Sequence, residues 1–112
     1  MTEKIPLADF EKLDLRVGKI LQVEDHPNAD KLYILKVDLG ESSPRTIVAG
    51  LRPYYEKESL LNKKAIFIAN LSPVILRGIE SNGMILAASS KDHKKVIFLT
   101  PEKDIEPGSK IR

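Results

Sequence analysis

Two stretches of the chain alternate between hydrophobic and polar residues, as strands with one buried face do. In residues 13–24 the predicted apolar face carries Leu13, Leu15, Val17, Leu21 and Val23. In residues 32–39 the same spacing places Tyr33, Leu35, Val37 and Leu39 on one face. Gly18, in the middle of the first stretch, predicts a bulge or strong coiling that would let one strand serve both sides of a small barrel.

Shorter apolar segments predict the rest of the architecture. Residues 64–71 are apolar on both faces, which indicates a strand inside a sheet, and Pro53 precedes a segment that predicts a short helix. Further strands are expected at residues 46–49, 83–89 and 96–99, with helical turns at residues 6–12 and a turn-rich extension at residues 101–112.

The order of these elements favours an all-β fold, a five-stranded OB-fold Greek-key barrel with a short N-terminal helix and a C-terminal extension. The main helix is expected between the third and fourth strands, as in that fold. Another small barrel or a sandwich remains open at this point. The 112 residues suffice for one domain, which would span residues 1–112.

Composition narrows the class of protein only partly. The net charge is +2, from 18 basic and 16 acidic residues, so a basic surface would require the two signs to be segregated. Because there is no cysteine, thiolate metal sites and disulfides are excluded. No apolar run reaches the roughly 20 residues of a membrane span, and the N-terminus lacks the apolar core of a signal sequence. We therefore expect a cytoplasmic protein with no membrane segment.

Motifs for catalysis are missing from the sequence. It contains no phosphate-binding loop, no dinucleotide fingerprint, no zinc-protease motif and no nucleophile elbow. The two histidines, His26 and His93, lie in a turn and in a charged loop, where we expect them to be solvated. The sequence thus predicts a protein that is not an enzyme, with no cofactor and no metal site.

The segment most suggestive of binding is NLSPVILRGIESNGMILAAS, residues 70–89, which would link two buried strands by a polar connection containing glycine. Arg77 lies there between Leu76 and Gly78, so we expect it to be held in place. Basic and amide side chains that suit phosphate and ribose contacts occur at strand ends and loops: Arg16, Lys31, Arg52, Asn70 and Arg77. With no tryptophan and few other aromatic residues, base stacking is not the expected mode.

Five blocks carry a resemblance to a known family. They are DLRVGKI (residues 14–20), HPNADKL (26–32), VAGL (48–51), NLSP (70–73) and RGIESNGMILAA (77–88). In this order the blocks resemble the tRNA-binding domain family, over nearly the whole chain. That family includes the C-terminal domain of methionyl-tRNA synthetases, free-standing structure-specific tRNA-binding proteins, cytokine-like synthetase cofactors and the N-terminal insert of the phenylalanyl-tRNA synthetase β chain.

The resemblance implies an OB-fold with short additions at both ends, through which the chain would form a homodimer. It implies structure-specific binding of tRNA without catalysis, as the C-terminal or dimerisation domain of methionyl-tRNA synthetase or as its trans-acting cofactor. The family positions associated with tRNA map onto Lys31, Asn70, Ser81 and Met84, and Arg77 and Arg16 are plausible additions. One departure is that Val74 and Ile75 stand where close relatives often have a basic residue.

Two other functions remain open on the sequence. A secretion-associated chaperone has this fold and size, and it would bind unfolded peptide in an apolar groove. The chain could also serve only as a structural dimerisation domain of a synthetase. The residues SNGM at positions 81–84 favour the tRNA-binding branch over the chaperone.

Overall fold

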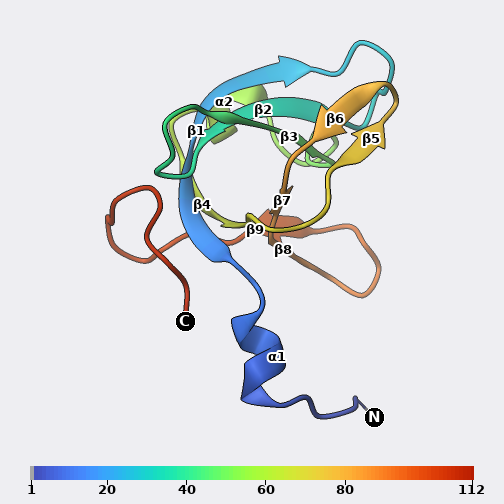
Figure 1. Ribbon diagram of the computed structural model, residues 1–112. Helices are drawn as coiled ribbons and strands as arrows, with labels where there is room; N and C mark the ends of the chain where they lie inside the picture. Colours follow the sequence, from blue (N-terminus) through green and yellow to red (C-terminus); the bar gives the residue numbers. More distant parts are fainter. Residues whose placement is uncertain (1) are drawn as a thin grey trace.

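The computed structural model describes residues 2–112 and has a nearly closed barrel at its centre (Figure 1). A five-stranded antiparallel sheet has the strand order β3-β2-β1-β4-β7. Its strands are β1 (Leu15–Asp25), β2 (Tyr33–Asp38), β3 (Arg45–Ala49), β4 (Lys64–Ile68) and β7 (Met84–Ile85). The predicted all-β, OB-like barrel is therefore confirmed.

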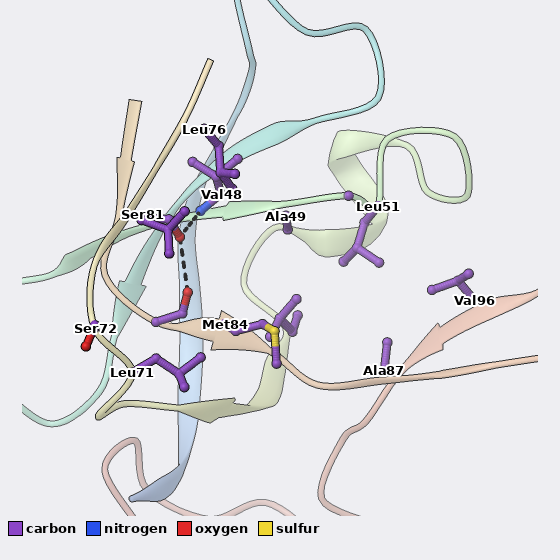
Figure 2. A pocket seen from close by; sticks show the side chains of 14 residues that line it. Val48, Ala49, Leu51, Leu71, Ser72, Leu76, Ser81, Met84, Ala87 and Val96 are labelled. Atoms are coloured by element: carbon purple, nitrogen blue, oxygen red, sulfur yellow. Dashed lines mark hydrogen bonds between the residues drawn. The ribbon is translucent and has the colours of Figure 1, made fainter. Parts of the chain in front are cut away.

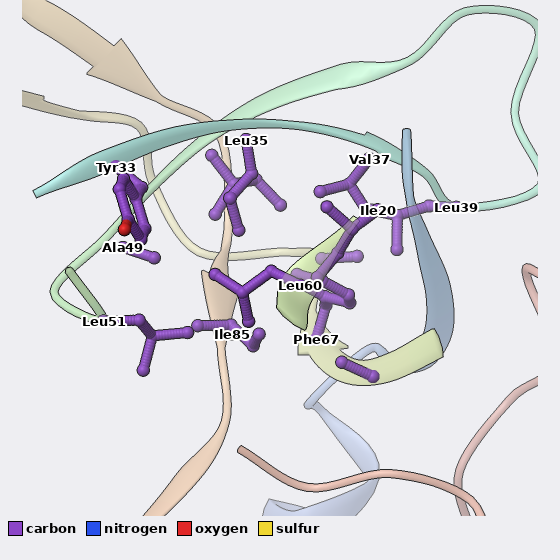
Figure 3. Packing of buried hydrophobic residues seen from close by; sticks show 13 residues of the cluster. Ile20, Tyr33, Leu35, Val37, Leu39, Ala49, Leu51, Leu60, Phe67 and Ile85 are labelled. Atoms are coloured by element: carbon purple, nitrogen blue, oxygen red, sulfur yellow. The ribbon is translucent and has the colours of Figure 1, made fainter. Parts of the chain in front are cut away.

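The barrel is filled by side chains that alternate along its strands. Ile20, Leu35, Val37 and Phe67 are completely buried there (Figure 3). The predicted face of β2 is confirmed, because its inward residues and the following Leu39 are all buried. Close packing of this kind makes the barrel the rigid part of the molecule.

The predicted face of β1 is confirmed only in part: Leu15 and Val17 are buried and Val23 packs against the core, but Leu13 is exposed. Gly18 and Ile20 face the barrel interior, since a Cβ atom on Gly18 would lie 2.7 Å from both Leu39 and Phe67. Pairing with β2 shifts register between Ile20 and Gln22, so the bulge lies beyond Gly18, and Val23 returns to the core after it. A bulge reverses the alternation of faces, so a single period-two pattern does not describe the whole strand.

The terminal additions differ in how they attach to the barrel. Helix α1 (Leu7–Glu11) has no buried residue and projects away from the barrel (Figure 1). The C-terminal extension instead runs along the start of β1, where the Val17 N–H donates to the Ser109 carbonyl at 2.9 Å and the Ile111 N–H to the Leu15 carbonyl at 2.8 Å. The extension thereby pairs with backbone groups of β1 that β2 leaves free.

Helix α2 (Lys57–Leu60) interrupts the strands where a helix was predicted, and it buries Leu60 completely. The predicted strand at residues 83–89 is divided into β7 and β8 (Ala87–Ser89), and β8 pairs with β9 (Val96–Phe98). No helix among residues 2–112 is long and apolar enough to cross a membrane.

The connection expected between two buried strands is itself a β-hairpin. Strand β5 (Val74–Leu76) pairs with β6 (Ile79–Ser81), and we call this pair the hairpin. Its two turn residues both have positive φ, 53° at Arg77 and 89° at Gly78. Two-residue turns with that geometry match the right-handed twist of paired strands, so the hairpin is a regular one.

Candidate nucleic-acid interface

Two segments far apart in the sequence lie side by side at one end of the barrel (Figure 1). One is the connection between the first two strands, residues 26–32, which we call the β1–β2 loop, and the other is the hairpin. His26 joins them, with its Nε2 3.0 Å from the Leu76 carbonyl oxygen. Loops at this end of an OB-type barrel commonly form its binding surface, so the joint defines a candidate site.

The hydrogen bonds of His26 assign its tautomer. The Asn28 N–H donates to Nδ1 at 3.0 Å, which requires an unprotonated Nδ1 and places the ring proton on Nε2. That Nε2–H then donates to the Leu76 carbonyl. The expectation that His26 is solvated is wrong, because only 3% of the residue is exposed.

The base of the hairpin is attached to β3 through Ser81. This residue is buried, and its hydroxyl accepts a hydrogen bond from the Val48 N–H at 2.9 Å and donates one to the Gly83 carbonyl at 3.1 Å (Figure 2). The backbone N–H of Asn82 also donates to the Thr46 carbonyl at 2.9 Å. Ser81 therefore satisfies a strand N–H of β3 that has no ladder partner there.

A groove of about 380 Å³ lies between the hairpin, the end of β3 and the strands that follow the hairpin (Figure 2). Its walls are mostly aliphatic, and they include Leu51, Leu71, Val74, Leu76, Met84 and Val96. Met84 is 47% exposed and Leu71 43% exposed, so apolar surface is open to solvent here. Exposed apolar surface in a concave site is typical of a binding site for an organic partner.

Three of the six predicted site residues have their polar atoms occupied within the chain. Ser81 is one. Asn70 accepts a hydrogen bond from the Asp14 N–H at 2.8 Å and donates to the Lys12 carbonyl at 2.7 Å, which fastens α1 to the barrel. Arg16 donates to both oxygens of Asp14, at 3.0 and 2.8 Å, and lies 3.6 Å from Glu41.

The ion pairs of this cluster shift the pKa values of two carboxyl groups. The hydrogen bond from Arg16 lowers the pKa of the Asp14 carboxyl below its ordinary value. The pKa of Glu41 is lowered as well, chiefly by its hydrogen bond with Arg45. Both carboxylates are therefore stabilised in the charged form, and Arg16 acts in a structural ion-pair network.

The other three predicted residues are exposed: Lys31 in the β1–β2 loop, Arg77 in the turn of the hairpin and Met84 in the groove. Within residues 2–112, neither Lys31 nor Arg77 has a side-chain hydrogen bond or ion pair. The turn holds the Arg77 backbone, but the side chain is free, contrary to expectation. The residue that braces the β1–β2 loop is Arg52, whose Nη1 donates to the Ala29 carbonyl at 3.3 Å.

His26 is the residue whose role sequence reasoning missed. The available signal was its position two residues before Asn28, because an acceptor there can take the N–H two residues on, as Asn and Asp side chains do in turns. Its second hydrogen bond spans fifty positions of sequence and leaves no local pattern. Only the folded chain reveals that contact.

The fold and this site define a class of protein. An OB-type barrel presents two joined loops, an apolar groove and two free cationic side chains, which suits binding of a ligand with anionic and apolar parts. Among residues 2–112 no three His, Asp or Glu side chains are grouped so that they could hold a metal ion. The arrangement is that of a binding module.

Comparison with known families makes this class specific. The family described as "Putative tRNA binding domain" matches residues 15–110, and the chain belongs to that family. A methionine–tRNA ligase of Pyrococcus horikoshii is 58% identical over 110 residues, which cover 98% of this chain and 15% of the ligase. The ligase of Nanoarchaeum equitans is 58% identical over 108 residues, covering 96% of this chain and 14% of the ligase.

The chain thus spans about 15% of the length of these relatives. Two solved structures match it over their whole length. A protein from Pyrococcus horikoshii described as related to methionyl-tRNA synthetase has a TM-score of 0.92 and 32% identity, covering 99% of this chain and 100% of its own. A CsaA chaperone protein from Picrophilus torridus has a TM-score of 0.87 and 36% identity, covering 97% of this chain and 100% of its own.

Proposed function

We propose that the chain is a non-catalytic module that binds tRNA by its shape, through phosphate and ribose contacts made at the β1–β2 loop and the hairpin. The observation that carries the proposal is that Lys31 and Arg77, both free of internal partners, lie on two segments joined by His26. Because the two segments are braced and the cations have no internal partner, phosphate binding would order only the side chains and would break no ion pair. Membership of the tRNA-binding family supports tRNA as the ligand.

The six residues predicted from the sequence contribute differently to this proposal. Lys31 and Arg77 would contact phosphates, and Met84 would contact an apolar part of the ligand from the groove. Arg16, Asn70 and Ser81 would act indirectly. Asn70 holds α1 and Ser81 holds the hairpin, while Arg16 is occupied by its ion pairs with Asp14 and Glu41. We expect substitutions of the first set to weaken binding without unfolding the chain.

We further propose that the chain acts with a methionyl-tRNA synthetase in the cytoplasm, as a domain of that enzyme or as a separate partner. The support is the similarity to methionine–tRNA ligases over 98% of this chain. Because the match covers 15% of the ligase, the aminoacylation reaction would belong to other parts of such an enzyme.

Dimerisation through the terminal additions is also part of the proposal. Leu7 on α1 is 71% exposed, and a groove of about 270 Å³ lies between the helix and the C-terminal residues 110–112. A helix this short is only marginally stable unless its apolar side packs against something. A second copy of the chain could bury that side. We expect sedimentation of the wild-type chain to give a dimer and Leu7→Glu to give a monomer. A wild-type monomer would contradict this part.

A titration at two salt concentrations tests tRNA binding. Fluorescence anisotropy would compare labelled tRNA with an RNA duplex of the same length, at about 50 and about 200 mM salt, a range over which phosphate-driven affinity falls steeply. We expect tighter binding to tRNA and a marked loss at high salt. Equal affinity for the two RNAs would contradict recognition by shape, and absence of salt dependence would contradict phosphate contacts.

A second candidate function has one observation in its favour. The groove is aliphatic and partly exposed, and a chaperone protein matches the fold at 36% identity, so the groove could hold apolar side chains of an unfolded peptide. Light scattering of an unfolding client protein separates the two functions. Suppression of aggregation by the chain, with no binding of tRNA, would favour the peptide-binding function.

A further inference from the structure

The hairpin is attached firmly at one end and sparsely at the other. At its base, Ser81 and Asn82 make backbone contacts with β3. Residues 71–78 are all exposed, including Ile75 at 69%. Among residues 2–112, the bond from His26 to the Leu76 carbonyl is the single hydrogen bond that joins residues 71–79 to a part of the chain outside the hairpin.

That bond is placed where it controls the direction of one side chain. The Leu76 carbonyl belongs to the peptide group that leads into Arg77, so fixing this carbonyl fixes where the turn begins. The positive φ values of Arg77 and Gly78 then determine the path of the turn itself. Without the bond, a short two-stranded hairpin has little stability of its own.

We infer that His26 is a positioning residue for RNA binding: its neutral, Nε2-protonated ring holds the turn of the hairpin against the β1–β2 loop, so that Arg77 and Lys31 face the ligand at a set spacing. This inference rests on the proposed function. The ring itself is buried and would not touch the RNA.

The two bonds of His26 can be separated by substitution. His26→Asn keeps an oxygen that can accept the Asn28 N–H, in the turn that Asn side chains make two residues on, but it is too short to reach Leu76. His26→Gln places an amide N–H near the position of Nε2 and can donate to the Leu76 carbonyl. His93→Asn, in the loop between β8 and β9, is the matched control.

The first measurement is independent of RNA. Amide hydrogen exchange and backbone order parameters would be recorded by NMR on the full chain for each variant. In His26→Asn we expect residues 74–79 to lose order while the barrel strands keep wild-type shifts, whereas His26→Gln and His93→Asn leave the hairpin ordered. Unchanged hairpin order in His26→Asn would overturn the inference. The ring ¹⁵N shifts of the wild-type chain should report Nε2–H, and the opposite tautomer would also overturn it.

The second measurement is a double-mutant cycle on tRNA affinity. We expect His26→Asn to weaken binding about fivefold in the wild-type background and less than about twofold in Arg77→Ala, because the histidine acts through the position of that arginine. His26→Gln should recover most of the affinity. Equal losses in the two backgrounds would mean a general structural role and would overturn the inference.

Failure of the proposed function would look different. If Arg77→Ala and Lys31→Ala both left tRNA binding unchanged, these cations would not be the RNA contacts, and the proposed site would be wrong. The NMR measurement would still decide whether His26 holds the hairpin.

Discussion

The barrel and the hairpin are built from the same kinds of residue but differ in where those residues lie. In β4, Ala65 and Phe67 are completely buried, and the strand has hydrogen-bonded neighbours on both sides. In β5, the equally apolar Val74 and Ile75 are 52% and 69% exposed. The barrel therefore contains the packed core, and the hairpin exposes its apolar groups to solvent.

The difference teaches that hydrophobic composition does not identify core in this chain. A strand is buried only if another layer covers it, and residues 71–78, which include β5, are all exposed. Four substitutions or conditions test this contrast, from the largest expected change in stability to the smallest.

Phe67→Ala tests the barrel. The side chain is completely buried among the core residues, and its loss would leave a cavity at the centre of the barrel. We expect the free energy of unfolding, measured by urea denaturation, to fall by about 3–5 kcal/mol. Ile75→Ala in the hairpin is the control and should change it by less than about 0.5 kcal/mol. Equal losses would abolish the distinction between the two regions.

Ser81→Ala tests the attachment of the hairpin. It removes the acceptor of the buried Val48 N–H, and an unsatisfied buried donor costs about 1–3 kcal/mol. We expect a loss in that range, with faster hydrogen exchange at Val48. Ser72→Ala, at an exposed serine, should leave both measurements near wild type. If Ser81→Ala left the free energy of unfolding unchanged, the hairpin would not depend on this bond.

Acid pH tests the ion pairs of Asp14, which pairs with Arg16 at 2.8 Å and with Lys110 of the extension at 3.7 Å. The pKa of Asp14 is lowered in the folded state, chiefly by Arg16, so its contribution to stability is present above the unfolded pKa of about 3.9. That contribution is lost as the pH falls through the folded pKa. We expect the free energy of unfolding to decrease below about pH 5, and less steeply in Asp14→Asn. Identical slopes for the two proteins would contradict the assignment.

Arg77→Ala should have the smallest effect on stability and a clear effect on binding. Because the side chain is exposed and free of internal partners, we expect a change in unfolding free energy below about 0.5 kcal/mol. Affinity for tRNA should fall about tenfold, and the salt dependence should become shallower by about one phosphate contact. Arg77→Lys, which keeps the charge, should retain most of the salt dependence. Unchanged affinity would remove Arg77 from the proposed site.

Much of the fold followed from local pattern, and the exceptions have identifiable causes. The faces of β2 and the buried β4 were predicted correctly because each strand has one consistent environment along its length. The face of β1 was predicted only in part, because the register shift between Ile20 and Gln22 exchanges its two sides. Arg77 and Gly78 form the turn of the hairpin, but the sequence did not predict this turn. Arginine is uncommon at positive φ, so the pair does not resemble a usual turn sequence.

The predicted site was sorted by the structure into two groups. Residue type alone could not separate Lys31 and Arg77 from Arg16, since all three are basic residues near strand ends. Arg16 is occupied by Asp14 and Glu41, and Glu41 lies in a different part of the sequence. Asn70 and Ser81 likewise have partners more than thirty positions away.

The sequence by itself determined the family, the order of the main strands along the chain and the absence of motifs for catalysis, because these depend on residues near one another or on ordered blocks. Only the tertiary structure decided which polar side chains are free to bind and which hold the chain together. The physical reason is that a hydrogen bond depends on distance in space, and the bonds of His26, Asn70 and Ser81 join segments that are distant in sequence.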